Sequence, residues 1–305
     1  MKYCVKFSKK LIFSLVFLFS LSFLMAFDWP VDVSSSNGSS QIKINFGENR
    51  GESFSNGFVI STSEDIKASD YGTVLVHINP DNTYYENFTS TLGNALIMVH
   101  RDNMISVYSG FEEISTECLI GEVERGTILG SVNKKQVIED NESSTKAPIL
   151  PKKDFEFQII DTKNIVVINP FLLLSKLEKT YPVFPGKIFV TNKKGTEFSL
   201  DERKSIASGI YSIYREYSPS RMPLKTSVFV NGEESSTINF DTILYKNSRI
   251  CVSGKDFYPI EKIYPNKNRQ FLGEIEISRG KNLISVIVTD CLGVERRINH
   301  TIEAW

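Results

Sequence analysis

Residues 92–111, LGNALIMVHRDNMISVYSGF, contain the pattern that decides the fold. Two short apolar runs, 95–99 and 104–108, flank the polar tripeptide Arg101-Asp102-Asn103. Short runs rich in β-branched and aromatic residues, separated by turn-forming residues, are typical of a β-hairpin. The stretch therefore predicts two antiparallel strands joined by a tight turn.

The sequence on either side continues the same pattern. A second hairpin is predicted from residues 119–123 and 127–132, with Glu124-Arg125-Gly126 as its turn. Further strands are indicated at 41–46, 58–60, 73–78, 154–160 and 165–168. These segments together predict an antiparallel β core in the first half of the chain.

The last third of the chain predicts a second β domain. Short apolar segments separated by turn residues occur at 226–230, 237–240, 243–245, 250–252, 271–277, 283–289 and 297–302. About seven short strands at such spacing are typical of a β-sandwich.

One helix is predicted between the two β regions. Ser199 and Glu202 have the spacing of a capping box, in which each side chain satisfies a free backbone N–H of the first turn. The apolar positions that follow would share one helical face: Ile206, Ile210, Ile213, Tyr214 and Tyr217. We expect this face to pack against the core.

Composition and the N-terminus indicate an exported globular protein. The 305 residues suffice for two domains, and a net charge of −1 without a basic stripe gives no sign of a nucleic-acid partner. Residues 1–26 combine several lysines, an apolar segment at 11–23 and a small residue, Ala26, which is typical of a signal peptide. The protein would contact a membrane only if this segment were not cleaved. We expect a periplasmic or cell-envelope location.

Three cysteines follow the signal segment, namely Cys118, Cys251 and Cys291. An exported sandwich could join Cys251 to Cys291 by a disulfide. Both could equally be small buried apolar residues. The sequence leaves these two interpretations open.

Motif order and spacing resemble a known family. The pattern GN-apolar-HxD-apolar-YxxF at 93–111, followed by VxxGxxLG at 123–130, is similar to the core of LytM/lysostaphin-type zinc endopeptidases of peptidase family M23, which cut peptidoglycan peptides. The resemblance runs from about 46 to 174 and implies the duplicated hybrid motif fold. The hairpin that starts at 279 resembles bacterial immunoglobulin-like domains.

The resemblance also implies where a zinc site would lie. Family members bind zinc through the His and Asp of HxGxD and the second His of HxH, and leave one coordination position for water. Here SNGFVI at 55–60 places Ser55 and Val59 at the first two ligand positions. DFEFQI at 154–159 has Asp154 and Glu156 in place of both histidines.

The remaining proton-handling position is also changed, because YSGF at 108–111 has Gly110 where the family has a His. Val59 and Gly110 offer no ligand atom, and two carboxylates without a third ligand make a poor metal site. We therefore expect no catalytic residue, no bound metal and no cofactor. The candidate binding groove would comprise Ser55, Tyr108, Asp154, Glu156 and Gln158.

Three functions remain open. The first is a non-catalytic LytM-like envelope protein that binds peptidoglycan or regulates a cell-wall hydrolase. The second is a zinc endopeptidase with displaced ligands, and the third is a purely structural or adhesive envelope protein.

The predicted fold class is mainly β, with a LytM-like core, a short helical connector and an immunoglobulin-like sandwich. The expected organisation is a signal peptide (1–26), a flexible lead-in (27–41), a degenerate LytM-like domain (42–176), a connector with one helix (177–222) and the sandwich (223–305).

Overall fold

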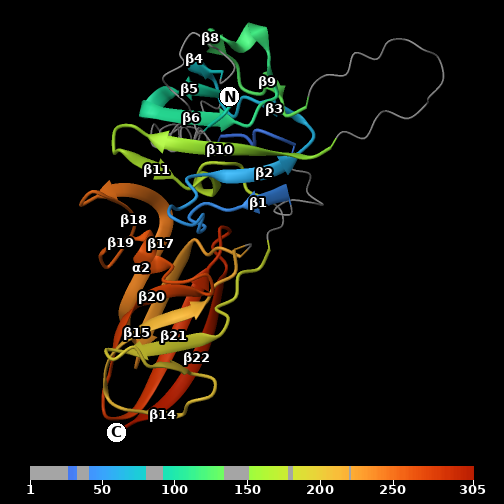
Figure 1. Ribbon diagram of the computed structural model, residues 1–305. Coiled ribbons are helices and arrows are strands. Elements are labelled where there is room, and N and C mark those ends of the chain that lie inside the picture. Colours follow the sequence, from blue (N-terminus) through green and yellow to red (C-terminus); the bar gives the residue numbers. More distant parts are fainter. Residues whose placement is uncertain (1–26, 33–40, 80–91, 134–150, 178–180, 220) are drawn as a thin grey trace, which may run out of the picture.

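A computed structural model describes residues 27–32, 41–79, 92–133, 151–177, 181–219 and 221–305. The expected signal peptide and residues 33–40 of the expected lead-in lie outside this range. The described chain is mainly β and forms two stacked units (Figure 1). We call residues 27–177 the N-terminal unit and residues 181–305 the C-terminal unit.

The N-terminal unit is built on antiparallel strands. These are β1 (Ile42–Ile44), β2 (Phe58–Thr62), β3 (Asp65–Lys67), β4 (Gly72–Ile78), β5 (Ala95–Val99), β6 (Met104–Ser109), β7 (Glu113–Ile114), β8 (Gly121–Val123), β9 (Ile128–Ser131), β10 (Lys153–Asp161) and β11 (Val166–Ile168). The main sheet has the order β11-β10-β6-β5-β4-β8, and β2 also pairs with β10. Strands β3, β9 and β7 form a small separate sheet. The hairpin predicted from the opening stretch is thus present as β5 and β6.

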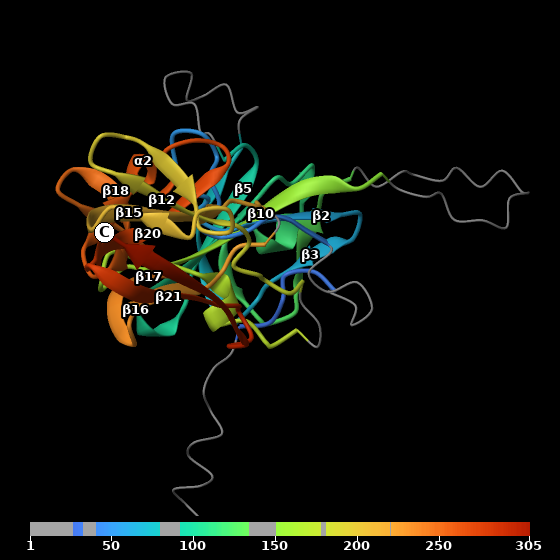
Figure 2. The ribbon, with the colours of Figure 1, turned by 90° about the horizontal axis from the view of Figure 1, so that it is seen from below.

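The C-terminal unit is a two-layered sandwich, and Figure 2 shows β12, β15 and β20 in one layer and β16, β17 and β21 in the other. Its strands are β12 (Ile188–Asn192), β13 (Glu197–Ser199), β14 (Ser205–Ile206), β15 (Gly209–Glu216), β16 (Lys225–Val230), β17 (Glu233–Lys246), β18 (Arg249–Gly254), β19 (Phe257–Pro259), β20 (Arg269–Ile277), β21 (Gly280–Thr289) and β22 (Glu295–Ala304). The layers have the orders β13-β12-β15-β20 and β14-β22-β21-β16-β17.

Helices are confined to single turns in the described residues. They are η3 (Arg101–Asn103), η4 (Thr116–Cys118), η5 (Pro170–Leu172) and α2 (Ile260–Ile263). None has the length and hydropathy that crossing a bilayer requires.

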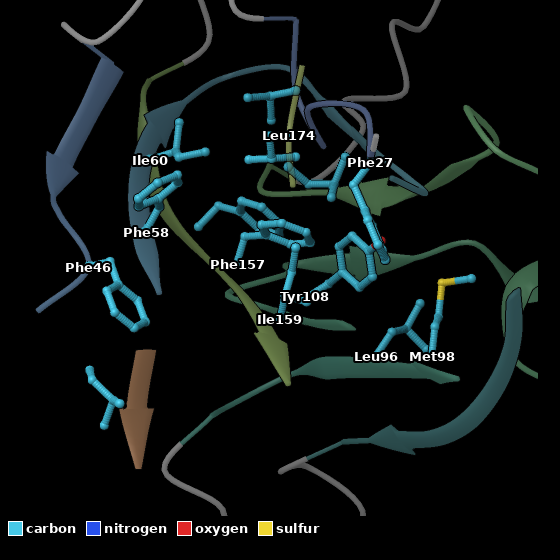
Figure 3. Close-up of a cluster of buried hydrophobic side chains, with 14 of the residues drawn as sticks. Phe27, Phe46, Phe58, Ile60, Leu96, Met98, Tyr108, Phe157, Ile159 and Leu174 are labelled. Atoms are coloured by element: carbon cyan, nitrogen blue, oxygen red, sulfur yellow. The ribbon is translucent and has the colours of Figure 1, made fainter. Parts of the chain in front are cut away.

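The N-terminal core lies on one face of the main sheet. Alternate residues of β10, namely Phe155, Phe157 and Ile159, are fully buried, and Figure 3 shows Phe157 and Ile159 beside Tyr108. Phe58 and Ile60 of β2 join the same cluster. Because side chains alternate along a strand, Asp154, Glu156 and Gln158 lie on the opposite face of β10.

The two units share one continuous sheet. Strand β11 of the N-terminal unit pairs with β17 of the C-terminal unit, from Val166 opposite Leu244 to Ile168 opposite Thr242. Just beyond this pairing, the Asn169 side chain donates a hydrogen bond to the Phe240 carbonyl at 2.8 Å and is buried. The junction is therefore a β ladder with its own buried side chains.

The predicted helix at 199–217 is wrong. The segment forms a turn after Ser199 and then β14 and β15, and β15 pairs with β12 and β20. Burial alternates along β15, where Tyr211, Ile213 and Arg215 face the interior. The apolar residues of this segment fit both the helical period of 3.6 and the strand period of 2. The segment forms a strand because its β-branched and aromatic residues pair with neighbouring strands.

The expected connector at 177–222 is therefore also incorrect. Strands β12 to β15 supply a whole layer of the sandwich, which closes a core of its own with β16, β21 and β22. The C-terminal unit thus begins well before residue 223.

The start of the expected flexible lead-in is packed. Phe27 is 4% exposed, and its amide donates to the Leu173 carbonyl at 2.8 Å. The Trp29 ring stacks on Phe58 at a centroid distance of 5.8 Å. These aromatic contacts hold residues 27–32 against the core.

Of the two interpretations left open for Cys251 and Cys291, the structure does not form the disulfide, and Cys251 is a buried free thiol. It lies on β18, whereas Cys291 follows β21, and the sheet order puts β17 and β16 between those two strands. Three inter-strand steps span about 14 Å, well beyond the Cα separation of a disulfide. Burial raises the pKa of the Cys251 thiol.

His100 is a buried group whose titration should affect stability. Phe27 packs edge-on against its ring at 5.0 Å. Its Nδ1 lies 2.8 Å from the Tyr71 carbonyl and its Nε2 lies 2.6 Å from Ser106 Oγ. The carbonyl can only accept, so Nδ1 carries the proton and Ser106 donates to Nε2. Burial lowers the pKa of His100 below 6.5.

We predict that acidification destabilises the protein through His100. Between the lowered pKa of the folded protein and 6.5, His100 binds a proton in the unfolded chain but not in the folded one. Neutral His100 therefore contributes fully to the unfolding free energy above pH 6.5, and this contribution is lost as the pH falls through that interval. Urea unfolding at pH 7.5 and 5.5 should show a smaller loss of unfolding free energy in His100→Gln than in wild type. Equal losses in both proteins would contradict the assignment.

Candidate functional site

Three of the expected vestigial positions meet on neighbouring strands. In the β2–β10 and β10–β6 pairings, Val59 lies opposite Glu156 and Glu156 lies opposite Ser109. Gly110 follows directly on Ser109. Residues opposite each other in an antiparallel ladder share a face, so Val59 and Glu156 are adjacent across that face. The structure therefore brings together positions that are far apart in sequence.

Glu156 is held by two neighbours. Its Oε2 accepts from Arg50 Nη1 at 3.0 Å, and its Oε1 accepts from Gln158 Nε2 at 3.0 Å. The Glu156 side chain is 20% exposed and that of Arg50 is 39% exposed. Both carboxylate oxygens of Glu156 are thus engaged in hydrogen bonds.

Asp154 makes a separate ion pair closer to solvent. Its Oδ2 lies 2.6 Å from Lys43 Nζ, and both side chains are about half exposed. Exposed pairs of this kind contribute about 0–1 kcal/mol to stability. The pairs therefore set the charge pattern of this face more than they hold the fold.

Gly110 and Gly57 are required by close backbone contacts. A Cβ on Gly110 would lie 2.6 Å from the Asp154 carbonyl oxygen, and Gly110 has a φ of +94°. A Cβ on Gly57 would lie 2.1 Å from the Phe157 carbonyl oxygen. Neither position has room for a side chain without displacing β10.

Two residues of the expected groove are not on its surface. Ser55 is fully buried and donates to the Gly57 carbonyl at 3.0 Å. Tyr108 is also fully buried, because it lies opposite Phe157 and so faces the core, and its hydroxyl accepts from the Ser69 amide at 2.9 Å. Asp154, Glu156 and Gln158 remain as the accessible members, with Lys43 and Arg50 added.

The donor set of this face does not resemble a metal centre. The described residues contain no group of three or more His, Cys, Asp and Glu side chains placed to hold a metal ion. Val59 contributes only apolar surface next to Glu156. What the face offers chemically is an alternation of fixed charged and amide groups that can form hydrogen bonds.

The loop that carries Arg50 is held by the C-terminal unit. The Tyr264 hydroxyl donates to the Gly47 carbonyl at 2.7 Å, and the Tyr217 hydroxyl accepts from the Asn49 amide at 3.1 Å. The two tyrosine rings pack together at 4.7 Å. We call this arrangement, Tyr217 and Tyr264 on the loop 47–49, the tyrosine clamp.

Burial shifts the ionisation of the clamp and its neighbour. It raises the pKa of Tyr217 to about 12 and also raises the pKa of Tyr264, so both hydroxyls keep their protons at neutral pH. Arg215, 1% exposed, hydrogen-bonds to Gln270 and to the Phe184 carbonyl, and burial lowers its pKa to about 10. Arg215 therefore remains charged behind the clamp.

Sequence patterns did not indicate these contacts. Arg50 was not among the expected site residues, and Tyr217 was placed on a helix. No local motif links Arg50 to Glu156 or Tyr264 to Gly47, because each pair is joined only by tertiary structure.

Comparisons with known proteins cover parts of the chain. A protein-family model matches residues 182–304. No curated protein matches the chain. Solved structures of M23 proteins are among the similar ones.

Three of these structures differ in how much of their own chain is matched. A catalytic-domain mutant of the prophage-encoded M23 protein EnpA from Enterococcus faecalis is 16% identical with a TM-score of 0.30, over 42% of this chain and 87% of its own. A zinc-containing peptidase from Vibrio cholerae is 18% identical with a TM-score of 0.27, over 44% and 36%. A chain of the SpoIIIAH–SpoIIQ complex is 19% identical with a TM-score of 0.29, over 48% and 89%.

We predict that restoring the family's His at position 110 destabilises the protein. Gly110→His combines a left-handed backbone with the clash against Asp154, whereas the control Gly121→His has a φ of +100° and open space around its Cβ. Both variants share the left-handed backbone, so they differ in the clash, and overpacking of this kind costs about 1–3 kcal/mol. Urea unfolding should therefore show a loss at least about 1 kcal/mol larger for Gly110→His. Equal losses of unfolding free energy in the two variants would show that β10 can move to make room for the side chain.

A second prediction concerns the tyrosine clamp. Tyr264→Phe leaves the buried Gly47 carbonyl without its donor and should lower the unfolding free energy by about 1–3 kcal/mol. Tyr245→Phe is the control, because that side chain is 66% exposed. If the two variants unfold at the same urea concentration, the clamp does not stabilise the contact between the units.

Proposed function

We propose that this chain is an exported cell-envelope protein whose N-terminal unit is a non-catalytic LytM-like module. The module binds peptidoglycan or a cell-wall hydrolase that it regulates. The C-terminal unit is an immunoglobulin-like sandwich that positions the module. The export signal and the envelope location come from the sequence of residues 1–26.

One observation supports the proposal most directly. Val59, Glu156 and Gly110 lie together on β2, β10 and the end of β6, at the positions that the motif spacing assigns to the family's zinc chemistry. Glu156 is paired there with Arg50 and Gln158. A frame in which these positions still converge, with an ion pair in place of ligands, is suited to binding and not to water activation.

The accessible groups fit a peptide-like ligand. Lys43 and Arg50 supply cationic donors, while Asp154 and Glu156 supply anionic acceptors on the same face. Wall stem peptides carry free carboxylates, amines and amides, which can exchange with such pairs. Charge-assisted hydrogen bonds of this type contribute about 1.5–3 kcal/mol each.

We predict that the exported chain co-sediments with purified peptidoglycan sacculi or changes the rate at which an added wall hydrolase digests them. Arg50→Ala should weaken the effect by about 10-fold or more, because it removes a charge-assisted contact of about 1.5–3 kcal/mol. Lys67→Ala is the matched control: it removes a cation from an ion pair of the same unit, the pair with Asp32 at 2.8 Å.

Three outcomes would oppose the proposal. Stoichiometric zinc in the purified protein together with cleaved muropeptides would favour a zinc endopeptidase with displaced ligands. Absence of both sacculus binding and any effect on the hydrolase would favour a structural or adhesive protein. Equal losses in Arg50→Ala and Lys67→Ala would move the binding surface away from the candidate site.

A further inference from the structure

A cavity lies on the C-terminal unit, where β18, β19, α2 and β20 meet. Its volume is about 790 Å³, which is within the range of small-molecule sites. It shares no residue with the candidate site on the N-terminal unit. Figure 1 places these elements in the upper part of the sandwich.

Aromatic rings form one wall of the cavity. Phe257 is 42% exposed, and Tyr258 packs against the buried Phe271 at 5.6 Å. Gly254 allows this placement, because a Cβ there would lie 3.0 Å from the Tyr258 ring. The cavity therefore presents exposed aromatic surface on a fixed backing.

The charged lining is balanced and already paired. Arg249 lies 2.7 Å from Glu261, and Lys262 lies 3.3 Å from Glu274. Lys262 also lies over the Phe271 ring at 4.4 Å. The cationic and anionic side chains of the lining balance, so the cavity has no net charge that would attract a strongly charged ligand, and hydroxyl groups can use the donors and acceptors that the pairs leave open.

A buried hydroxyl lies at the inner wall. Ser236 is 3% exposed, and its Oγ interacts with the Tyr258 side chain although it forms no hydrogen bond of normal geometry within the described part of the chain. A Cβ on Gly273 would lie 2.1 Å from this oxygen, so the glycine leaves the space that the hydroxyl uses. The Ser236 hydroxyl is enclosed and does not open into the cavity, so this residue shapes the inner wall and offers no contact to a ligand.

We propose that this cavity binds a neutral carbohydrate. A sugar ring would lie on the exposed face of Phe257 beside Tyr258, and its hydroxyls would bond to the paired side chains. The inference deepens the proposed function, on which it rests for the source of the ligand, because the glycan strand of peptidoglycan is such a carbohydrate. It assigns the glycan to the C-terminal unit and the stem peptide to the N-terminal unit.

The test is calorimetric titration of the exported chain with chitotetraose, a neutral oligomer of N-acetylglucosamine. Wild type should bind one equivalent. Phe257→Ala and Phe257→Leu should both weaken binding by about 10-fold, since the stacking of the sugar on a flat aromatic ring is lost in each. The leucine variant keeps apolar bulk and protects the test against misfolding.

Tyr245→Ala is the matched control, because it removes an exposed aromatic ring of the same unit outside the cavity. It should bind chitotetraose as wild type does. Thermal unfolding of all variants should agree closely, which would attribute the loss to the cavity.

Several results would overturn the inference. These are no binding of chitotetraose by wild type, equal affinities in the Phe257 and Tyr245 variants, or tighter binding of a sulfated tetrasaccharide that is lost in Arg249→Ala. Failure of the proposed function can be distinguished from failure of this inference. Arg50→Ala tests the proposed function, because it should reduce sacculus binding and leave the affinity for chitotetraose unchanged.

Discussion

The pairing of β11 with β17 is the constraint on which the rest of the structure depends. It joins a sheet of the N-terminal unit to a layer of the sandwich through main-chain hydrogen bonds, from Val166 to Ile168. The buried core continues across the junction, where Phe240 and Ile243 of β17 cluster with Phe58 and Phe157. The shared main-chain pairing and the shared buried core fix the position of one unit relative to the other.

The tyrosine clamp gives that arrangement a chemical consequence. The loop that presents Arg50 to Glu156 is bonded at Gly47 and Asn49 to side chains of the C-terminal unit. Gly47 also lies close to Phe240, since a Cβ there would be 2.8 Å from that ring. The candidate site is therefore completed by the C-terminal unit, although all of its charged members belong to the N-terminal unit.

Sequence patterns predicted the strands around the site and the face that Asp154, Glu156 and Gln158 share, because alternation along β10 is a local property. The resemblance to M23 motifs also implied that Val59 and Glu156 would come together. Sequence patterns failed where two periods fit the same residues, as at 206–217, and where burial depends on the partner strand, as for Tyr108. Contacts such as Arg50 with Glu156 have no local signal, so only the folded arrangement reveals them.

The length of β17 has a mechanical consequence. This strand of fourteen residues pairs with β16 at one end and with β11 further along, so a single segment spans both units. Bending between the units would break main-chain hydrogen bonds of β17, whereas a flexible peptide linker could bend without breaking any. The molecule therefore works as a stiff spacer: whatever holds the far end of the sandwich sets a constant height for the charged face at the other end.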